Sequence, residues 1–313
     1  MRYLAMSTLV AATLLAGCAT QPGFKPMPAA AVEKVKNSDI NVIVPQKEIK
    51  LAINQSNLTA AAGGGLLFAL IDTAVNNSRT DTAETTVANL RNSLLDFSFN
   101  DTAMDAVKRE TGNISWIAEK NVQLITTGDN KQLEKVLADS KRDIFTTIAF
   151  FYELSADGQT MVVTGIANAY PNNDQLKTLQ RDLYKGTTKL DDKTALHLNQ
   201  LNSLYRDIIT YRESLPDTYK EPAAALAVWG NADARLAKQA LTDGANVIAA
   251  QLAQDFIAAN SKTVAPADGQ FTVVLQGHKL NATRDKTGHV TILSKTTDMA
   301  TSTAAAPATT AAN

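Results

Sequence analysis

The sequence predicts an α+β fold, in which helices cover a small mixed β-sheet and a long antiparallel helical hairpin lies near the C-terminal third. Segments 142–154 and 160–169 are dense in β-branched and aromatic residues and flank a short glycine-containing turn. Segment 191–259 instead repeats leucine at helical spacing on both sides of Pro216. Because strands are expected on both sides of this helical segment, we expect a single body over residues 38–294.

Composition narrows the class of protein. Of 313 residues, 45% are hydrophobic and 19% are charged, which is typical of a globular chain. The formal net charge is -1, and no basic domain is visible in the sequence. A nucleic-acid partner is therefore not expected. The single cysteine, Cys18, excludes an intramolecular disulfide and a cysteine-type zinc site.

The N-terminal residues have the layout of a secretory signal. Arg2 is followed by an apolar run over residues 4–15, which is too short to span a bilayer as a mature helix. The run closes with Leu15-Ala16-Gly17-Cys18, which resembles the lipobox of bacterial lipoproteins. The resemblance implies that residues 1–17 are a signal peptide, cleaved between Gly17 and Cys18. It also implies a diacylglycerol on the Cys18 sulfur and an acyl chain such as palmitate on its amino group.

The same resemblance predicts the location of the protein. The residue after the cysteine is Ala19, not the aspartate that commonly retains such lipoproteins in the inner membrane. We therefore expect a protein of the Gram-negative cell envelope that is anchored through Cys18. The outer membrane is favoured over the inner membrane. Residues 18–37 read as a flexible tether, and the Thr- and Ala-rich residues 295–313 as a disordered tail.

The first third of the body mixes strand and helix signals. Residues 39–54 alternate with period two around Pro45, which predicts a strand with a bulge or edge there. The glycine-rich apolar stretch 60–71 predicts a helix start or tight turn at its three glycines, followed by a buried helix over about 65–76. A membrane-inserting or pore-forming segment is the alternative, but the uncharged run stops at Asp72, short of the roughly 20 residues that a span needs.

The elements that follow are expected in alternation. Helices are predicted at 81–97, 103–110, around 133–137 and from 176, with a short strand at 122–125. The two strands of segments 142–154 and 160–169 should form a hairpin through Ala156-Asp157-Gly158-Gln159. Helices over 198–215 and 222–259 form the expected helical hairpin, and a final pair of strands is expected at 271–275 and 290–293.

Few residues are candidates for chemistry. His278 and His289 could approach each other with Asp285 as a further metal ligand, although solvated hairpin histidines are commoner. His197, beside Asp191 and Asp192, reads as a solvated residue at a helix end. No recognised catalytic, cofactor-binding or zinc motif is present, so catalytic, metal and cofactor residues are all predicted as none.

One aromatic and cationic cluster suggests binding. Tyr205, Tyr211, Arg206 and Arg212 recur along the predicted long helix and could dock a glycan or a protein. Half-buried tyrosines are the alternative.

The sequence thus favours a non-catalytic lipoprotein that binds or scaffolds an envelope partner, protein or peptidoglycan, through the helical hairpin. The alternative is an envelope hydrolase, for example on peptidoglycan, whose site has no local motif.

Overall fold

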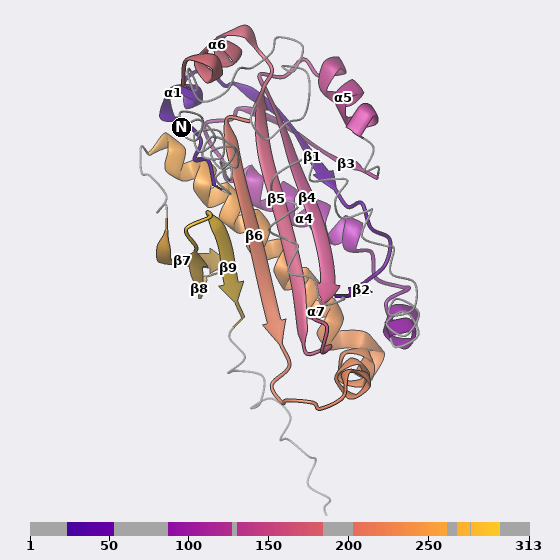
Figure 1. The fold of residues 1–313 in the computed structure, drawn as a ribbon. Coiled ribbons are helices and arrows are strands. Elements are labelled where there is room, and N and C mark those ends of the chain that lie inside the picture. Colours follow the sequence, from indigo (N-terminus) through magenta and orange to yellow (C-terminus); the bar gives the residue numbers. More distant parts are fainter. Residues whose placement is uncertain are drawn as a thin grey trace, which may run out of the picture.

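The computed structural model describes residues 24–52, 87–126, 130–183, 203–261, 268–275 and 277–294. Within these ranges the chain is a mixed α/β body built on one nine-stranded sheet (Figure 1). The sheet is therefore larger than the small one that the sequence predicts. The elements are α1 (Ala29–Val32), β1 (Asn37–Ile43), β2 (Lys50–Leu51), α4 (Phe99–Gly112), β3 (Glu119–Ile125), α5 (Asn130–Asp139), β4 (Ile144–Leu154), β5 (Thr160–Pro171), α6 (Asp174–Leu183), β6 (Tyr205–Ser214), α7 (Pro222–Asn260), β7 (Gly269–Leu275), β8 (His278–Arg284) and β9 (His289–Leu293).

The strand order is β3-β1-β4-β5-β6-β9-β8-β7, and β2 pairs with the end of β4. Strand β1 pairs in parallel with both β3 and β4. The centre, β4-β5-β6, is antiparallel, and β9 then adds in parallel to β6. The sheet is thus mixed, and its central strands are buried along almost their whole length.

The predicted β-hairpin is confirmed. Strands β4 and β5 pair in register from Ile144 opposite Pro171 to Leu154 opposite Met161. The turn between them contains Gly158, whose φ of +71° is a conformation that favours glycine. The indole of Trp229 donates a 2.8 Å hydrogen bond to the Gly158 carbonyl, so α7 also fastens this turn.

The predicted helical hairpin is wrong in its first half. Residues 205–214 form β6, paired on one side with β5 and on the other with β9. The leucine spacing that indicated a helix continues into a segment whose residues also alternate with period two. Tyr205, Asp207 and Ile209 face one side of the sheet and are fully buried there. Burial of both faces removes the polar alternation by which a strand is recognised in sequence.

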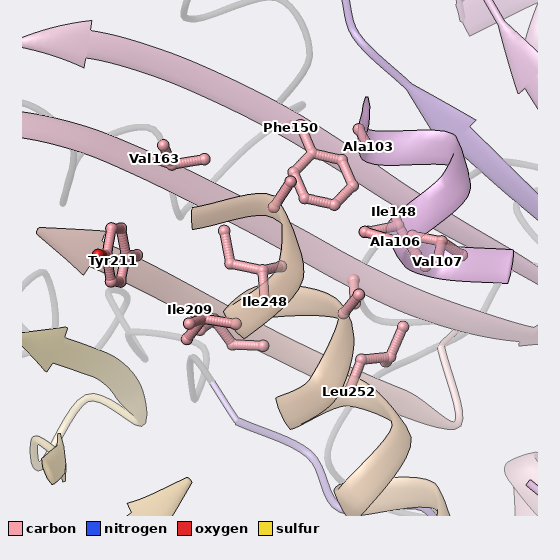
Figure 2. Close-up of a cluster of buried hydrophobic side chains, with 14 of the residues drawn as sticks. Ala103, Ala106, Val107, Ile148, Phe150, Val163, Ile209, Tyr211, Ile248 and Leu252 are labelled. Atoms are coloured by element: carbon pink, nitrogen blue, oxygen red, sulfur yellow. The ribbon is translucent and has the colours of Figure 1, made fainter. Parts of the chain in front are cut away.

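The second long helix is confirmed as α7, although its backbone is interrupted. Residues 231–234 leave helical geometry, and Ala232, Asp233 and Ala234 have positive φ. Beyond this interruption α7 runs along the inner face of β5 and β6, with α4 beside it (Figure 2). None of the described helices has the length and apolarity to cross a bilayer.

Two glycines let α7 approach the sheet. A Cβ on Gly244 of α7 would lie 2.5 Å from Cγ2 of Val163, and one on Gly165 of β5 would lie 2.3 Å from Cγ2 of Ile248. Each glycine therefore accepts a β-branched side chain from the opposite element. Gly244 is therefore needed for the close packing of α7 against the sheet.

Part of the predicted tether is packed on the body. Phe24, Met27, Ala31 and Val35 are buried in the main hydrophobic core. Lys25 pairs with Arg206 of β6 through two backbone hydrogen bonds of 2.8 and 2.9 Å. Apolar residues at these four positions lie among prolines and alanines, which is why composition alone suggested a tether.

The C-terminal pair of strands is a set of three. The predicted strands at 271–275 and 290–293 correspond to β7 and β9, and β8 lies between them. Strand β8 is polar in sequence, HKLNATR, and was not predicted. Cys18, the stretch 60–71, His197 and residues 295–313 lie outside the described residues.

Candidate functional site

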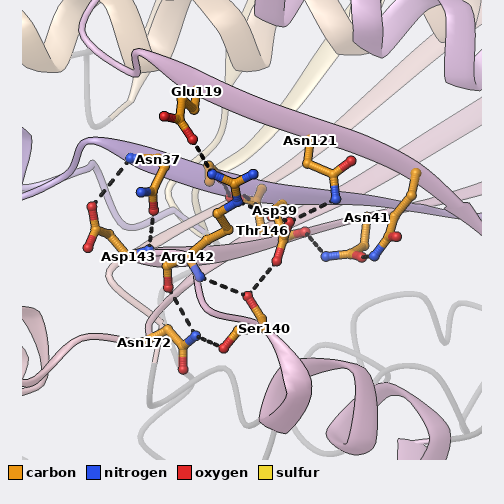
Figure 3. A network of polar contacts seen from close by, with 12 residues as sticks. Asn37, Asp39, Asn41, Glu119, Asn121, Ser140, Arg142, Asp143, Thr146 and Asn172 are labelled. Carbon is orange, nitrogen blue, oxygen red and sulfur yellow. Dashed lines mark hydrogen bonds and ion pairs between the residues drawn. The ribbon is translucent and has the colours of Figure 1, made fainter.

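Three polar clusters lie in the described body, and the first joins the starts of the parallel strands (Figure 3). The Asp39 carboxylate of β1 accepts hydrogen bonds from Asn121 Nδ2 at 2.9 Å and Ser140 Oγ at 2.5 Å. Arg142 lies 3.9 Å from Asp39 and forms an ion pair with Glu119. These contacts link β1, β3 and the segment entering β4.

Asp143 completes this first cluster. Its carboxylate accepts from the backbone N–H groups of Lys36 and Asn37 and from Asn173 Nδ2. Burial alone would raise the pKa of Asp143, but these hydrogen bonds outweigh it and the pKa lies below its usual value. The carboxylate is fully used in joining β1 to β4, so its role is structural.

The second cluster lies between the sheet and α7. Arg284 of β8 donates to both oxygens of Asp207 of β6, at 2.8 and 3.0 Å. Tyr205 Oη donates to Asp255 Oδ2 of α7 at 2.8 Å, and the Arg284 guanidinium lies 3.5 Å from the ring centroid of Phe24. The cluster ties the N-terminal segment, the central strand, α7 and the C-terminal strands together.

Both carboxyl groups of this second cluster are deeply buried. Burial, and then the charge of Asp255, raise the pKa of Asp207. Burial also raises the pKa of Asp255. The Arg284 guanidinium is the one cation beside these two carboxyl groups in the described cluster, and it opposes the rise in both pKa values. Asp207 is 0% and Asp255 7% exposed, so a substrate does not reach these carboxyls.

The third cluster, which we call the polar row, crosses the sheet on the face opposite α7. Strand register places its members side by side on five neighbouring strands: Gln123, Asn41, Thr147, Asn168 and Arg206. Gln123 Nε2 donates to Asn41 Oδ1 at 2.6 Å, and Arg206 Nη1 donates to Asn168 Oδ1 at 3.1 Å. The neighbouring row on the same face is mainly aliphatic, with Ile43 and Ala149 among its members.

Helix α5 packs across the middle of the polar row, over β1, β4 and β5. Leu133 contacts Ile43 and Ala149 on one side of the row, and Leu137 contacts Phe145 and Tyr170 on the other. One end of the row is Arg206, which is only 2% exposed. Its Nε and Nη2 atoms have no hydrogen-bond partner. In the second cluster, Nε of Arg284 and Oε1 of Gln251, whose amide nitrogen binds Asp255, are likewise buried without a hydrogen-bond partner.

The structure separates the aromatic and cationic residues that the sequence grouped on one helix face. Tyr205 and Tyr211 point toward α7 and bind Asp255 and Glu213. Arg206 and Arg212 point to the opposite face, because neighbouring residues of a strand alternate. The predicted composite face is therefore wrong.

The two C-terminal histidines are not brought together. By the register of β8 with β9, His289 lies opposite Asp285, seven residues along β8 from His278. At about 3.3 Å per residue this separates them by roughly 23 Å. Across the described ranges, no three His, Cys, Asp or Glu side chains gather where they could hold a metal ion.

Sequence reasoning missed the partners of these clusters. Asp207, Asp255 and Arg284 are distant in the chain, and only the packing of β6, α7 and β8 brings them together. Asn168 and Arg206 pair for the same reason. The period-two alternation of residues 205–211 was the one local signal that could have placed Arg206 on the outer face.

The chain was compared with known proteins. No protein-family model and no curated protein matches it. A solved PelC dodecamer from Paraburkholderia phytofirmans is similar over 45% of this chain and 65% of that chain, so the match spans just under two thirds of its length. The sequence identity is 9% and the TM-score is 0.16, which establishes neither a shared fold nor a shared function.

Proposed function

We propose that this protein is a lipid-anchored lipoprotein of the Gram-negative cell envelope whose folded body binds an envelope partner without catalysis. The observation that carries the anchor is Leu15-Ala16-Gly17-Cys18 after an apolar run. Cleavage before Cys18 would leave an acylated cysteine, and Ala19 favours the outer membrane, with the body facing the periplasm.

The polar row supports the binding part of the proposal. It is a line of amide, hydroxyl and guanidinium groups on the sheet face opposite α7, in which Gln123 is half-buried and the other four are buried, and the exposed Arg212 lies on the same face. The hydrolase alternative gains no support from the described residues, because the paired carboxyls of Asp207 and Asp255 are enclosed beneath α7.

Membrane fractionation tests the anchor. Wild-type chain should sediment with membranes and incorporate labelled palmitate, and Cys18→Ser should lose both. Thr20→Ala, two residues downstream, is the matched control and should behave as wild type. Membrane association of Cys18→Ser would contradict the anchor and direct attention to residues 60–71.

Site-specific crosslinking tests the binding face. Deleting residues 191–259 is uninformative, since it removes β6 and α7 from the core. A photocrosslinker at Arg212, which is exposed on the face of the polar row, should capture a defined envelope partner. The same group at Arg235, exposed on α7, is the control. Equal capture at both positions would contradict this choice of face.

A further inference from the structure

Strand β7 is an open edge of the sheet. It is the last member of the described strand order, in which its one neighbour is β8. Gln270, Thr272 and Val274 of this strand are exposed to solvent, and Val274 is 45% exposed although it is apolar. The outer side of β7 is therefore accessible to a further strand.

The register of β7 determines which of its backbone groups face outward. Leu275 lies opposite His278 with two residues between them, so these two residues exchange backbone hydrogen bonds. Such positions alternate with positions whose N–H and C=O groups point away from β8, and the three exposed residues named above are the outward ones. The Val274 carbonyl accepts a hydrogen bond from Gln254 Nε2 at 3.1 Å, and its second lone pair can accept another.

Strand β7 also lacks the features that keep an edge strand from pairing. Natural edge strands carry charged residues or proline, which block the addition of another strand. Segment Gly269–Leu275, GQFTVVL, contains no charged residue and no proline. Strand β3, at the opposite edge, begins with Glu119 and Lys120, and Glu119 forms an ion pair with Arg142. The two edges of the sheet therefore differ, and β7 is the one suited to pairing.

We propose that β7 pairs with β7 of a second copy of this chain, antiparallel and about a two-fold axis at Thr272. This register overlaps the whole of both strands and places Gln270 opposite Val274 of the second copy. The outward hydrogen-bonding positions of the two strands then coincide. Phe271, which is half-buried at the edge, lies beside Val273 of the second copy and becomes more deeply covered.

The charges that flank β7 favour a second copy as the partner. Exposed Asp268 precedes the strand, and exposed Lys279 of β8 lies opposite Val274 near the other end. Antiparallel pairing brings Asp268 of each copy to the end that carries Lys279 of the other, and the two-fold axis makes this happen twice. Parallel pairing would set like charges side by side. The inference goes beyond the proposed function, since it concerns an edge of the sheet and not the face of the polar row.

Cysteine crosslinking of the full chain in cell membranes tests the pairing. Thr272→Cys should give a disulfide-linked dimer under mild oxidation, because opposite Cα atoms of a hydrogen-bonded pair lie about 5.5 Å apart. Asn281→Cys is the matched control. It is exposed on β8 beside Thr272, but three strand spacings, about 14 Å, separate it from its counterpart. Wild type, whose one cysteine is Cys18, gives the background. Equal dimer formation by the two variants would overturn the proposal.

Mixed cysteine variants test the register. Chains with Gln270→Cys should crosslink to co-expressed chains with Val274→Cys, because the two-fold axis at Thr272 sets these positions opposite each other. Neither variant should crosslink to itself. Self-crosslinking of Gln270→Cys without the mixed product would contradict this antiparallel register.

Charge reversal at the axis separates pairing from misfolding. Thr272→Lys and Thr272→Glu each set two like charges directly opposite each other, so each should sediment at half the wild-type protein mass in density-matched detergent. An equimolar mixture of the two variants should restore the dimer, which a misfolded chain could not do. A monomeric wild type, or a mixture that stays monomeric, would overturn the proposal.

A photocrosslinker at Thr272 identifies any other occupant of the edge. An adduct of twice the chain mass supports the second copy. An adduct of a different mass alone would assign the edge to a strand of another protein and would overturn the proposal. Membrane fractionation of Cys18→Ser is read independently of all these variants, so failure here leaves the anchor tested separately.

Discussion

Arg206 and Arg284 show two ways in which this protein treats a buried arginine. Arg284 is enclosed by the Asp207 carboxylate, the Gly288 carbonyl and the ring of Phe24. Arg206 has one amide partner, and two of its nitrogens, Nε and Nη2, are buried without a hydrogen-bond partner, against one, Nε, in Arg284. The first arrangement pairs the charge with a carboxylate within the fold, and the second pairs it only with an amide oxygen. Burial alone does not distinguish these roles, but the inventory of partners does.

Replacing Arg284 should destabilise the protein in a pH-dependent way. Arg284→Met leaves Asp207 and Asp255 without a cation and should cost about 3 kcal/mol near pH 7. A carboxyl whose folded-state pKa is raised binds its proton more tightly in the folded state. Stability therefore falls as pH rises from the unfolded to the folded pKa. The loss should be larger at pH 8 than at pH 5 in urea unfolding.

The control for this prediction is Arg109→Met. Arg109 forms its ion pair with Glu110 with 47% of its side chain exposed, so the cost should stay below about 1 kcal/mol. A loss for Arg284→Met that does not change between pH 5 and pH 8 would show that its carboxyl partners do not titrate as a buried pair.

At the scale of elements, local patterns and long-range pairing contributed differently. The β4–β5 hairpin and α6 were predictable because turn chemistry and amphipathic spacing are local. Strand β6 was not, because charged residues inside a central strand argue against burial unless their partners are known. The buried carboxylate of Asp207 is stabilised by Arg284, which lies 77 residues away in the sequence. The polar row was equally hidden, since only register assembles it.

The contact between α7 and the sheet gives an element-scale prediction. Gly244→Ala should destabilise the protein by about 1–3 kcal/mol, because the new methyl group would overlap Val163 and approach Tyr211. Gly230→Ala is a matched control in the same helix, with no atom within 4 Å of the added Cβ. It should be neutral or stabilising by up to about 1 kcal/mol. Chemical unfolding of both variants measures the difference, and equal effects would refute close packing at Gly244.

At the scale of the whole molecule, the packed N-terminal segment shortens the link to the proposed anchor. Phe24 is buried against Arg284, so residues 19–23 are all that separates Cys18 from the body. Five residues and their flanking bonds reach about 20 Å when extended. An acyl group on Cys18 would therefore hold one end of the body near the membrane surface. That end carries α1 and α6, where Asn173 donates to the Lys34 carbonyl (Figure 1).

Fluorescence quenching by brominated lipids measures this orientation. Single labels at Thr178→Cys on α6 and at Ala156→Cys in the β4–β5 turn lie near opposite ends of β5, which is about 36 Å long. The label at 178 should be quenched more strongly, because the short link keeps its end of the sheet near the bilayer. The same labels in a Cys18→Ser background give the unanchored reference. Stronger quenching at 156 would place the opposite end against the membrane, which a link of this length does not permit if Phe24 stays buried.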